Sequence, residues 1–282
     1  MTEVLIATNG FIDSWNAVEY GAWFAESMRM KITLLGVTEK LDSVASDDHH
    51  PLEDVFERAV RLFKERGVAY SLEVQTGSAE QVIAKKANSG AYITVLGPLG
   101  RPQFRRWLVG RSIRDFLESI SRPILYVPAV RLPMQKLLIS LGGLGYEVDA
   151  ETLALKVAVQ NKAEVTLLHI VPPVDLDYPT ARVASENWRD LINTDTVLGR
   201  NLRKAVETVE AAGLKATVDV RQGHVVEEIT AALKSKEYDL LCMGSPYGGN
   251  PLRQLYAPNV TAEIAEAAYC PVLVARHMQA SV

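Results

Sequence analysis

The sequence predicts an α/β protein built from two tandem doubly wound five-stranded parallel-sheet domains. The chain has 282 residues, about twice the usual length of one domain. Its two halves repeat the same landmarks in the same order, and short apolar runs alternate with helical periodicity in each half. With 48% hydrophobic and 23% charged residues, the composition is typical of a globular protein and excludes intrinsic disorder.

An internal repeat defines the domain organisation. Asn9 and Gly97 are 88 positions apart, whereas Gly142 and Gly244 are 102 apart, so the second half carries 14 extra residues, which fall within Pro172–Thr196. The expected domains are residues 1–129 and 134–282. The matched segments are Val4–Gly10 with Leu137–Gly143, Lys31–Val37 with Glu164–Ile170, Gln75–Gly77 with Arg221–Gly223, Ala91–Gly97 with Tyr238–Gly244, and Arg122–Val127 with Cys270–Ala275.

The spacing of apolar residues predicts about five strands and four helices in each half. The segment Ile93–Leu96 is largely apolar, as expected for a strand that helices cover on both faces. Three predicted helices each have one apolar face. These faces consist of Ala17, Gly21, Phe24 and Met28; Ile113, Phe116, Leu117 and Ile120; and Ala150, Leu153, Ala154 and Val157.

Charge and cysteine content exclude several classes of protein. Lys and Arg total 30 against 34 Asp and Glu, a formal net charge of −4, which gives no overall attraction to nucleic acid or anionic membranes. Cys242 and Cys270 are too few for a disulfide scaffold and lack a second ligand at metal-binding spacing.

The N-terminus lacks an export-signal pattern, and no apolar run approaches the length of a membrane span. We therefore expect a cytoplasmic protein without nucleic-acid or membrane partners.

One glycine-rich loop follows the fourth predicted strand of the first half. Ligands of doubly wound sheets bind beyond the carboxyl ends of the strands, and here Gly97 and Gly100 are followed, after nine residues, by Gly110, Arg111 and Ser112. In one interpretation the backbone N–H groups cradle a phosphate at the start of the next helix. In the other, Gly97 and Gly100 only allow a tight turn after the strand, and Gly110 only ends the segment that precedes the helix. The residues alone leave both open.

The pattern G-x-x-G, nine residues, G, then a helix and a strand introduced by x-Pro resembles the universal stress protein family. Its duplication along nearly the whole chain is similar to the tandem form of that family. The resemblance implies an adenine nucleotide alpha hydrolase-like fold that holds the triphosphate of ATP, with Mg²⁺, in the glycine loop. It also implies that Asn9 contacts the adenosine and that the Val37 backbone supports the adenine. The cofactor-binding residues expected are Asn9, Val37, Gly97, Gly100, Gly110, Arg111 and Ser112.

Several residues depart from the family pattern. The acidic residue after the first strand is replaced by Asn9, which can hydrogen-bond but carries no charge, and in the second half by Gly142, which has no side chain. Arg111 stands where the family has Ser or Thr. In the second half the third glycine aligns with Pro258, which has no N–H to offer a phosphate. The first site is therefore altered and the second degraded.

Five arginines crowd the first loop. Guanidinium groups bind phosphate in a bidentate fork, so these residues could pair with a nucleotide or another anion. They could equally form a solvated rim or pair with acidic groups of the other domain, and we favour this structural role slightly for the outer ones. The five are Arg101, Arg105, Arg106, Arg111 and Arg114.

Other candidate sites receive weaker support. Ser140–Gly143 lacks the Asp-Ser pair of adenylating enzymes, no P-loop motif occurs, and no catalytic triad can be nominated. His49 and His50 could bind a divalent metal beside two aspartates, although a charged loop is the commoner explanation. His169 is expected to pack, and His224 to cap a helix or lie at the surface. The insertion that contains Trp188 could form a lid, a wall or an interface, or pack at the sheet edge.

Together these observations predict a non-catalytic stress-response protein that binds an adenine nucleotide, ATP, in its first domain. The alternative is a module for a non-nucleotide small ligand or for protein interaction, with degraded ATP sites. A slow ATP hydrolase is a third possibility. The resemblance also implies that the two domains associate with each other and that the chain forms a homodimer, with Ile124–Val127 and Val272–Ala275 as the matching last strands.

Overall fold

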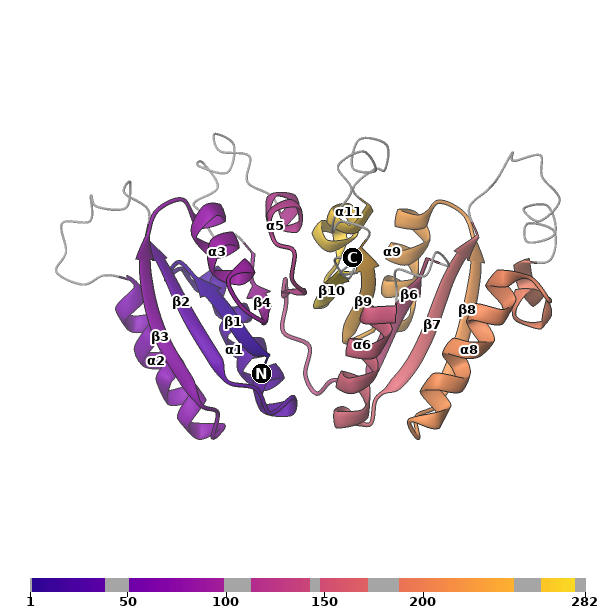
Figure 1. Ribbon diagram of the computed structural model, residues 1–282, viewed down its shortest axis with the longest axis horizontal. Helices are drawn as coiled ribbons and strands as arrows, with labels where there is room; N and C mark the ends of the chain where they lie inside the picture. Colours follow the sequence, from indigo (N-terminus) through magenta and orange to yellow (C-terminus); the bar gives the residue numbers. More distant parts are fainter. Residues whose placement is uncertain are drawn as a thin grey trace. The chain divides into compact units, whose positions relative to one another are not determined.

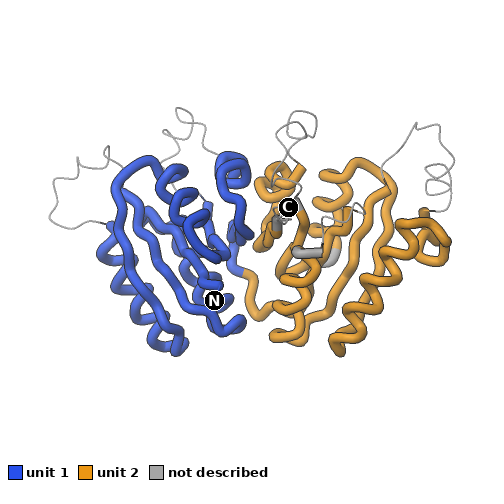
Figure 2. The backbone as a smooth tube through the Cα atoms, viewed as in Figure 1, with its two compact units in different colours: residues 1–130 blue, residues 131–282 orange. Residues whose placement is uncertain are grey.

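The structure, a computed structural model, describes residues 2–38, 51–98, 113–142, 148–171, 188–245 and 260–276. The chain divides into two compact units, Met1–Val130 and Arg131–Val282 (Figure 2). Each unit is an α/β domain with a parallel sheet, as the sequence predicts.

The first unit alternates strands and helices along the chain (Figure 1). Its elements are β1 (Glu3–Thr8), the 3-10 helix η1 (Ile12–Ser14), α1 (Trp15–Ser27), β2 (Ile32–Thr38), α2 (Pro51–Glu65), β3 (Tyr70–Thr76), α3 (Ala79–Asn88), β4 (Tyr92–Leu96), α5 (Ile113–Ser119) and β5 (Ile124–Tyr126). The strands lie in the order β3-β2-β1-β4-β5, and each described pair is parallel.

The second unit repeats this plan. Its elements are β6 (Lys136–Leu141), α6 (Val148–Asn161), β7 (Glu164–Val171), the 3-10 helix η3 (Trp188–Asn193), α8 (Val197–Ala211), β8 (Ala216–Gln222), α9 (Val225–Lys236), β9 (Leu240–Ser245), α11 (Val260–Ala267) and β10 (Val272–Arg276). The strands lie in the order β8-β7-β6-β9-β10, again parallel. In the described part of the chain each unit thus has five strands and four α-helices, which confirms the predicted number.

Helices cover both faces of the first sheet. α1 packs against α2, and α3 packs against α5. Successive residues of a strand point to opposite faces, and on β3 the ring of Tyr70 meets Phe63 of α2 while Glu73 bonds to Lys86 of α3. The sheet therefore lies between these two helix pairs, which is the doubly wound arrangement.

The core of each unit is formed by the strands and the apolar helix faces predicted from the sequence. In β1, Val4, Leu5 and Ile6 are fully buried, because helices cover both faces of a parallel sheet. The apolar faces of α1 and α5 are buried except for Met28, which caps α1 and is half-buried. On α6, Leu153 is half-buried, while Ala150, Ala154 and Val157 are buried.

The repeat seen in the sequence is reproduced in the strand register. Aligning the halves equates Thr8 with Leu141 and Gly36 with His169. In the structure Thr8 pairs with Gly36, and Leu141 pairs with His169. The two sheets therefore use the same register at the carboxyl end of the first strand, although the paired residues differ in chemistry.

Candidate functional site

The strand order of the first unit identifies one candidate edge for a ligand. The chain runs from β1 outward to β2 and β3, and then returns to β4 on the other side of β1. Such a reversal opens a crevice at the carboxyl ends of the two central strands, where doubly wound proteins bind ligands. Asn9 follows β1, Gly97 follows β4, and Val37 lies near the end of β2. The fold thus brings these three predicted residues to one edge of the sheet.

A chain of hydrogen bonds organises the turn between β1 and α1. The Ser14 hydroxyl donates to the Phe11 carbonyl at 2.7 Å, and the Thr8 and Ser14 hydroxyl oxygens lie 2.7 Å apart. Because the single proton of Ser14 is committed to Phe11, the Thr8 hydroxyl donates to Ser14. Thr8 in turn accepts from the Gly10 N–H at 3.2 Å. This pair is a part of the site that the sequence analysis missed, although a buried-strand Thr followed by Ser at a helix start was a usable signal.

Asn9 contributes to the shape of the same turn. Its side-chain oxygen accepts a hydrogen bond from the Phe11 N–H at 3.1 Å, the arrangement in which an Asn side chain closes a turn on its own backbone. The side chain is half-buried. Asn9 therefore has a structural role in addition to its position at the candidate ligand edge.

Two glycines allow the elements around this edge to approach closely. Gly10 has φ +84°, and a Cβ there would lie 2.8 Å from backbone atoms of Pro51 and Leu52 at the start of α2. A Cβ on Gly97 would lie 3.2 Å from the Asp13 carbonyl oxygen and 3.4 Å from Ala17 Cβ. The end of β4 thus lies close to η1 and α1 at Gly97, and an added side chain would require a small shift.

The end of β2 extends beyond β1. The pairing of these strands ends at Thr8 opposite Gly36, so Val37 and Thr38 continue past the end of β1. On the other side β2 stays paired with β3, where Val37 lies opposite Gln75. Val37 is 4% exposed, so its side chain packs in the core and is not available to a ligand at this edge.

The remaining predicted residues of the glycine loop, Gly100, Gly110, Arg111 and Ser112, lie outside the described residues, as do Arg101, Arg105 and Arg106. Arg114, the second residue of α5, is exposed. His49, His50 and Pro258 also fall outside the described part of the chain.

The equivalent edge of the second unit is built from different groups. Gly142 follows β6 and is exposed. His169, at the position of Gly36 in the first unit, is 4% exposed, and its Nδ1 donates to the Leu141 carbonyl at 2.8 Å. The expectation that His169 packs is therefore confirmed. His224 is the exposed N-cap of α9, as predicted.

Both cysteines are buried and free. Burial raises the pKa of the Cys242 thiol well above its ordinary value, and it raises the pKa of Cys270 to about 12. Both are thus protonated core residues. Among the described residues no group of three or more His, Cys, Asp or Glu side chains could hold a metal ion. No helix in the described ranges is long and apolar enough to cross a membrane.

The duplicated parallel sheet, with a reversal of strand order in each half, defines a tandem doubly wound α/β protein. The chain belongs to the universal stress protein family, whose family model matches residues 1–128 and 134–276. The two matched segments confirm the tandem form of the family.

Full-length relatives have the same organisation. A curated universal stress protein of Synechocystis is 23% identical over 308 residues, covering 98% of this chain and 100% of the relative. The crystal structure of a universal stress protein from Archaeoglobus fulgidus covers 98% of this chain and 97% of its own at 16% identity, with a TM-score of 0.67. One from Pseudomonas aeruginosa covers 98% and 92% at 14% identity, with a TM-score of 0.62. At these identities the structures support the fold.

Proposed function

We propose that the first unit binds an adenine nucleotide, ATP with Mg²⁺, at the carboxyl edge of β1, β2 and β4. The observation that carries this proposal is the convergence of Asn9, Val37 and Gly97 at the reversal of strand order. Backbone groups of β2 beyond the end of β1 would hydrogen-bond to the adenine. The Asn9 side-chain amide would hydrogen-bond to the adenosine. The glycine loop 97–112 would hold the phosphates.

The protein acts, in this proposal, as a non-catalytic sensor or binding protein of the stress response. The sequence offers no catalytic triad. In this proposal other molecules respond to the nucleotide-bound state of the protein and not to nucleotide hydrolysis. A cytoplasmic location and a homodimer formed through the last strands remain predictions of the sequence.

Calorimetric titration of the whole chain with ATP and Mg²⁺ tests the binding step. Gly110→Pro removes a backbone N–H from the loop and should abolish the heat of binding. Gly213→Ala is a control in the second unit: it strains a backbone with φ +78° but places no atom within 4 Å of the added Cβ, so it should leave the heat of binding unchanged. No heat for the unsubstituted chain would refute the nucleotide hypothesis in favour of a non-nucleotide ligand or a protein-interaction role.

Asn9 offers a graded test of the adenosine contact. Asn9→Asp keeps an oxygen that can accept from the Phe11 N–H and adds a charge, so nucleotide affinity should be retained or increased. Asn9→Ala loses both the turn bond and the ligand contact and should weaken binding.

Phosphate release followed over hours addresses catalysis, since turnover would contradict a sensor role.

A further inference from the structure

The first unit has an exposed apolar strip on its edge strand. Within the described residues β3 pairs with β2 alone and is the outermost strand of that sheet. Leu72 and Val74 on β3 are 41% and 58% exposed. An exposed edge strand with large apolar residues is a template for pairing with another chain unless it is covered or blocked.

Charge does not block this edge. The only charged residue of β3 is Glu73, and its carboxylate is bonded to Lys86 of α3 at 2.7 Å. Leu72 and Val74 project from the face that carries α2, because Tyr70, two residues before Leu72, contacts Phe63 of α2. The apolar strip and the ion pair thus lie on opposite faces of the same strand.

The second unit covers the equivalent strip with its own chain. The repeat equates Leu72 and Val74 with Val218 and Val220 of β8, and both valines are half-buried. Helix η3, from the insertion of the second half, packs against β8 and α8, and its Leu191 is fully buried. The described part of the insertion, residues 188–196, therefore packs at the sheet edge, one of the roles the sequence allowed.

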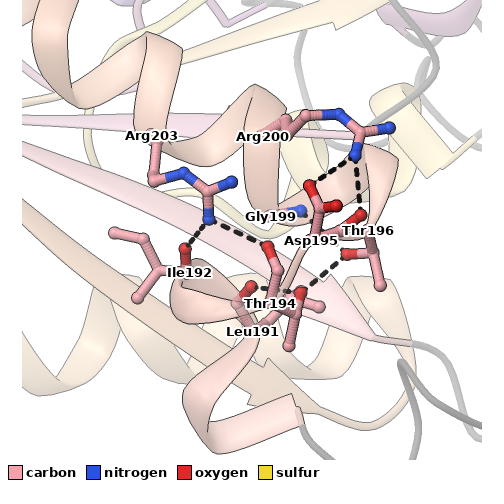
Figure 3. A network of polar contacts seen from close by, with 8 residues as sticks. All are labelled: Leu191, Ile192, Thr194, Asp195, Thr196, Gly199, Arg200 and Arg203. Carbon is pink, nitrogen blue, oxygen red and sulfur yellow. Dashed lines mark hydrogen bonds and ion pairs between the residues drawn. The ribbon is translucent and has the colours of Figure 1, made fainter.

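Polar contacts anchor this cover (Figure 3). Arg203 of α8 donates to the carbonyls of Ile192 and Thr194, the latter at 2.8 Å. Thr196 caps α8 by accepting from the Gly199 N–H at 3.0 Å. Hydrogen bonds within the second unit thus hold η3 over β8, whereas the equivalent residues of β3 are exposed.

The outward backbone groups of β3 follow from its pairing with β2. Ile32 N–H donates to the Ala69 carbonyl, and Gly77 N–H donates to the Thr38 carbonyl, both at 2.9 Å. Alternate residues of a strand direct their N–H and C=O groups to the same side. Odd-numbered residues therefore face β2, and Tyr70, Leu72, Val74 and Thr76 direct their backbone groups away from it.

We propose that β3 binds β3 of a second copy of this chain as an antiparallel pair, with Glu73 at the two-fold axis. In this register Leu72 lies opposite Val74 of the second copy and Val74 opposite its Leu72. The N–H and C=O groups of all four outward-facing residues then find hydrogen-bonding partners. The two apolar strips join on the α2 face. The proposal is independent of nucleotide binding and of the last strands.

The side-chain pattern of β3 favours a second copy as the partner, because Leu72 and Val74 flank Glu73 symmetrically. Glu73 would lie opposite Glu73, and like charges in directly opposed residues are destabilising. Each carboxylate, however, carries its own Lys86 at 2.7 Å, so two positive and two negative groups meet at the axis. A copy of the same strand thus matches this edge in backbone pattern and in the placing of its apolar residues, and Lys86 offsets the opposed carboxylates.

Sedimentation velocity of the full chain tests the interface, with a dimer expected for the natural sequence. Val74→Pro removes an N–H that faces away from β2, a position where an edge strand tolerates proline, and should abolish association through β3 and so yield a smaller species. Val220→Pro is the matched control at the equivalent edge position of β8 and should leave the dimer. Leu72→Lys/Val74→Lys should weaken association at least about tenfold, whereas Val159→Lys, at a site 39% exposed on α6, should not.

Cysteine cross-linking tests the register directly. Residues with inward-facing backbone groups approach to about 4.5 Å between Cα atoms in an antiparallel pair, within disulfide range. Glu73→Cys should therefore form a covalent dimer under mild oxidation, because the two native cysteines are buried. Gln75→Cys, opposite residue 71 of the second copy, should not. A monomeric natural chain, or a dimer unaffected by Val74→Pro together with no Glu73→Cys cross-link, would overturn the proposal.

Discussion

The hydroxyl oxygens of Thr8 and Ser14 lie 2.7 Å apart and tie the end of β1 to the start of α1. Both side chains are nearly inaccessible to solvent, at 4% and 5% exposed. This bond fixes the turn that presents Asn9 at the carboxyl edge of the sheet. The shape of the candidate site therefore depends on a buried polar pair beneath it.

Ser14→Ala should destabilise the protein by about 1–3 kcal/mol, because the buried Thr8 hydroxyl would lose its acceptor. Urea denaturation measures this change. Thr76→Val is the matched control, since the Thr38–Thr76 hydroxyl pair has a similar distance of 2.8 Å but is exposed, and its loss should cost less than about 0.5 kcal/mol. Equal effects of the two substitutions would contradict the importance of burial.

Gly10→Ala should be more damaging than Gly67→Ala. Both glycines have positive φ, +84° and +64°, but an added Cβ meets backbone atoms of Pro51 and Leu52 at 2.8 Å only at Gly10, and nothing within 4 Å at Gly67. Backbone strain is common to the two, so the difference in unfolding free energy isolates the steric clash and should be about 1–3 kcal/mol. A difference near zero would mean that α2 shifts freely.

Arg203→Met should release η3 from α8 and cost about 1.5–3 kcal/mol, because two backbone carbonyls lose a charged donor. Arg200→Met, on the same helix, is the control: its partner Asp195 has a side chain 92% exposed, and surface ion pairs contribute little. Hydrogen exchange of the Leu191 region should accelerate in the first variant alone. Similar exchange rates in both variants would show that Arg203 does not hold η3 against α8.

The native protein should resist thiol reagents at pH 8, while both cysteines should react in denaturant. Burial raises the folded-state pKa of Cys242 and Cys270 above the unfolded value, so the stability that depends on their protonated forms is complete below about pH 8.5. It should fall as the pH rises from there toward the folded pKa, about 12 for Cys270. Rapid labelling of the folded chain at pH 8 would contradict this.

Lys86 should contribute to stability in a pH-dependent way. The hydrogen bond to Glu73 raises the pKa of Lys86, so its contribution is complete below the unfolded pKa of about 10.4. The contribution is lost as the pH rises through the folded pKa. Lys86→Met should therefore cost up to about 1 kcal/mol at pH 8 and less at pH 11.5. A cost independent of pH would assign the effect to packing alone.

The sequence was sufficient to predict the duplicated fold because its signals are local and repeated. Apolar periodicity alone predicted the buried faces of α1, α5 and α6. The order of the repeated segments equated Thr8 with Leu141 and Gly36 with His169. The resemblance to the universal stress proteins, carried by the glycine pattern, implied that Asn9, Val37 and Gly97 lie near one ligand, and parallel strands whose carboxyl ends meet at one edge place them there.

Only the tertiary structure decided how these residues are used. The Thr8–Ser14 pair, the Asn9 turn and the contact of Gly10 with the start of α2 depend on distances between separate elements, which periodicity does not encode. The contrast between β8, covered by η3, and β3, exposed at Leu72 and Val74, is likewise a matter of which chain segment folds back on which strand. Burial is a property of the assembled unit, so two halves with the same pattern can present different edges to solvent.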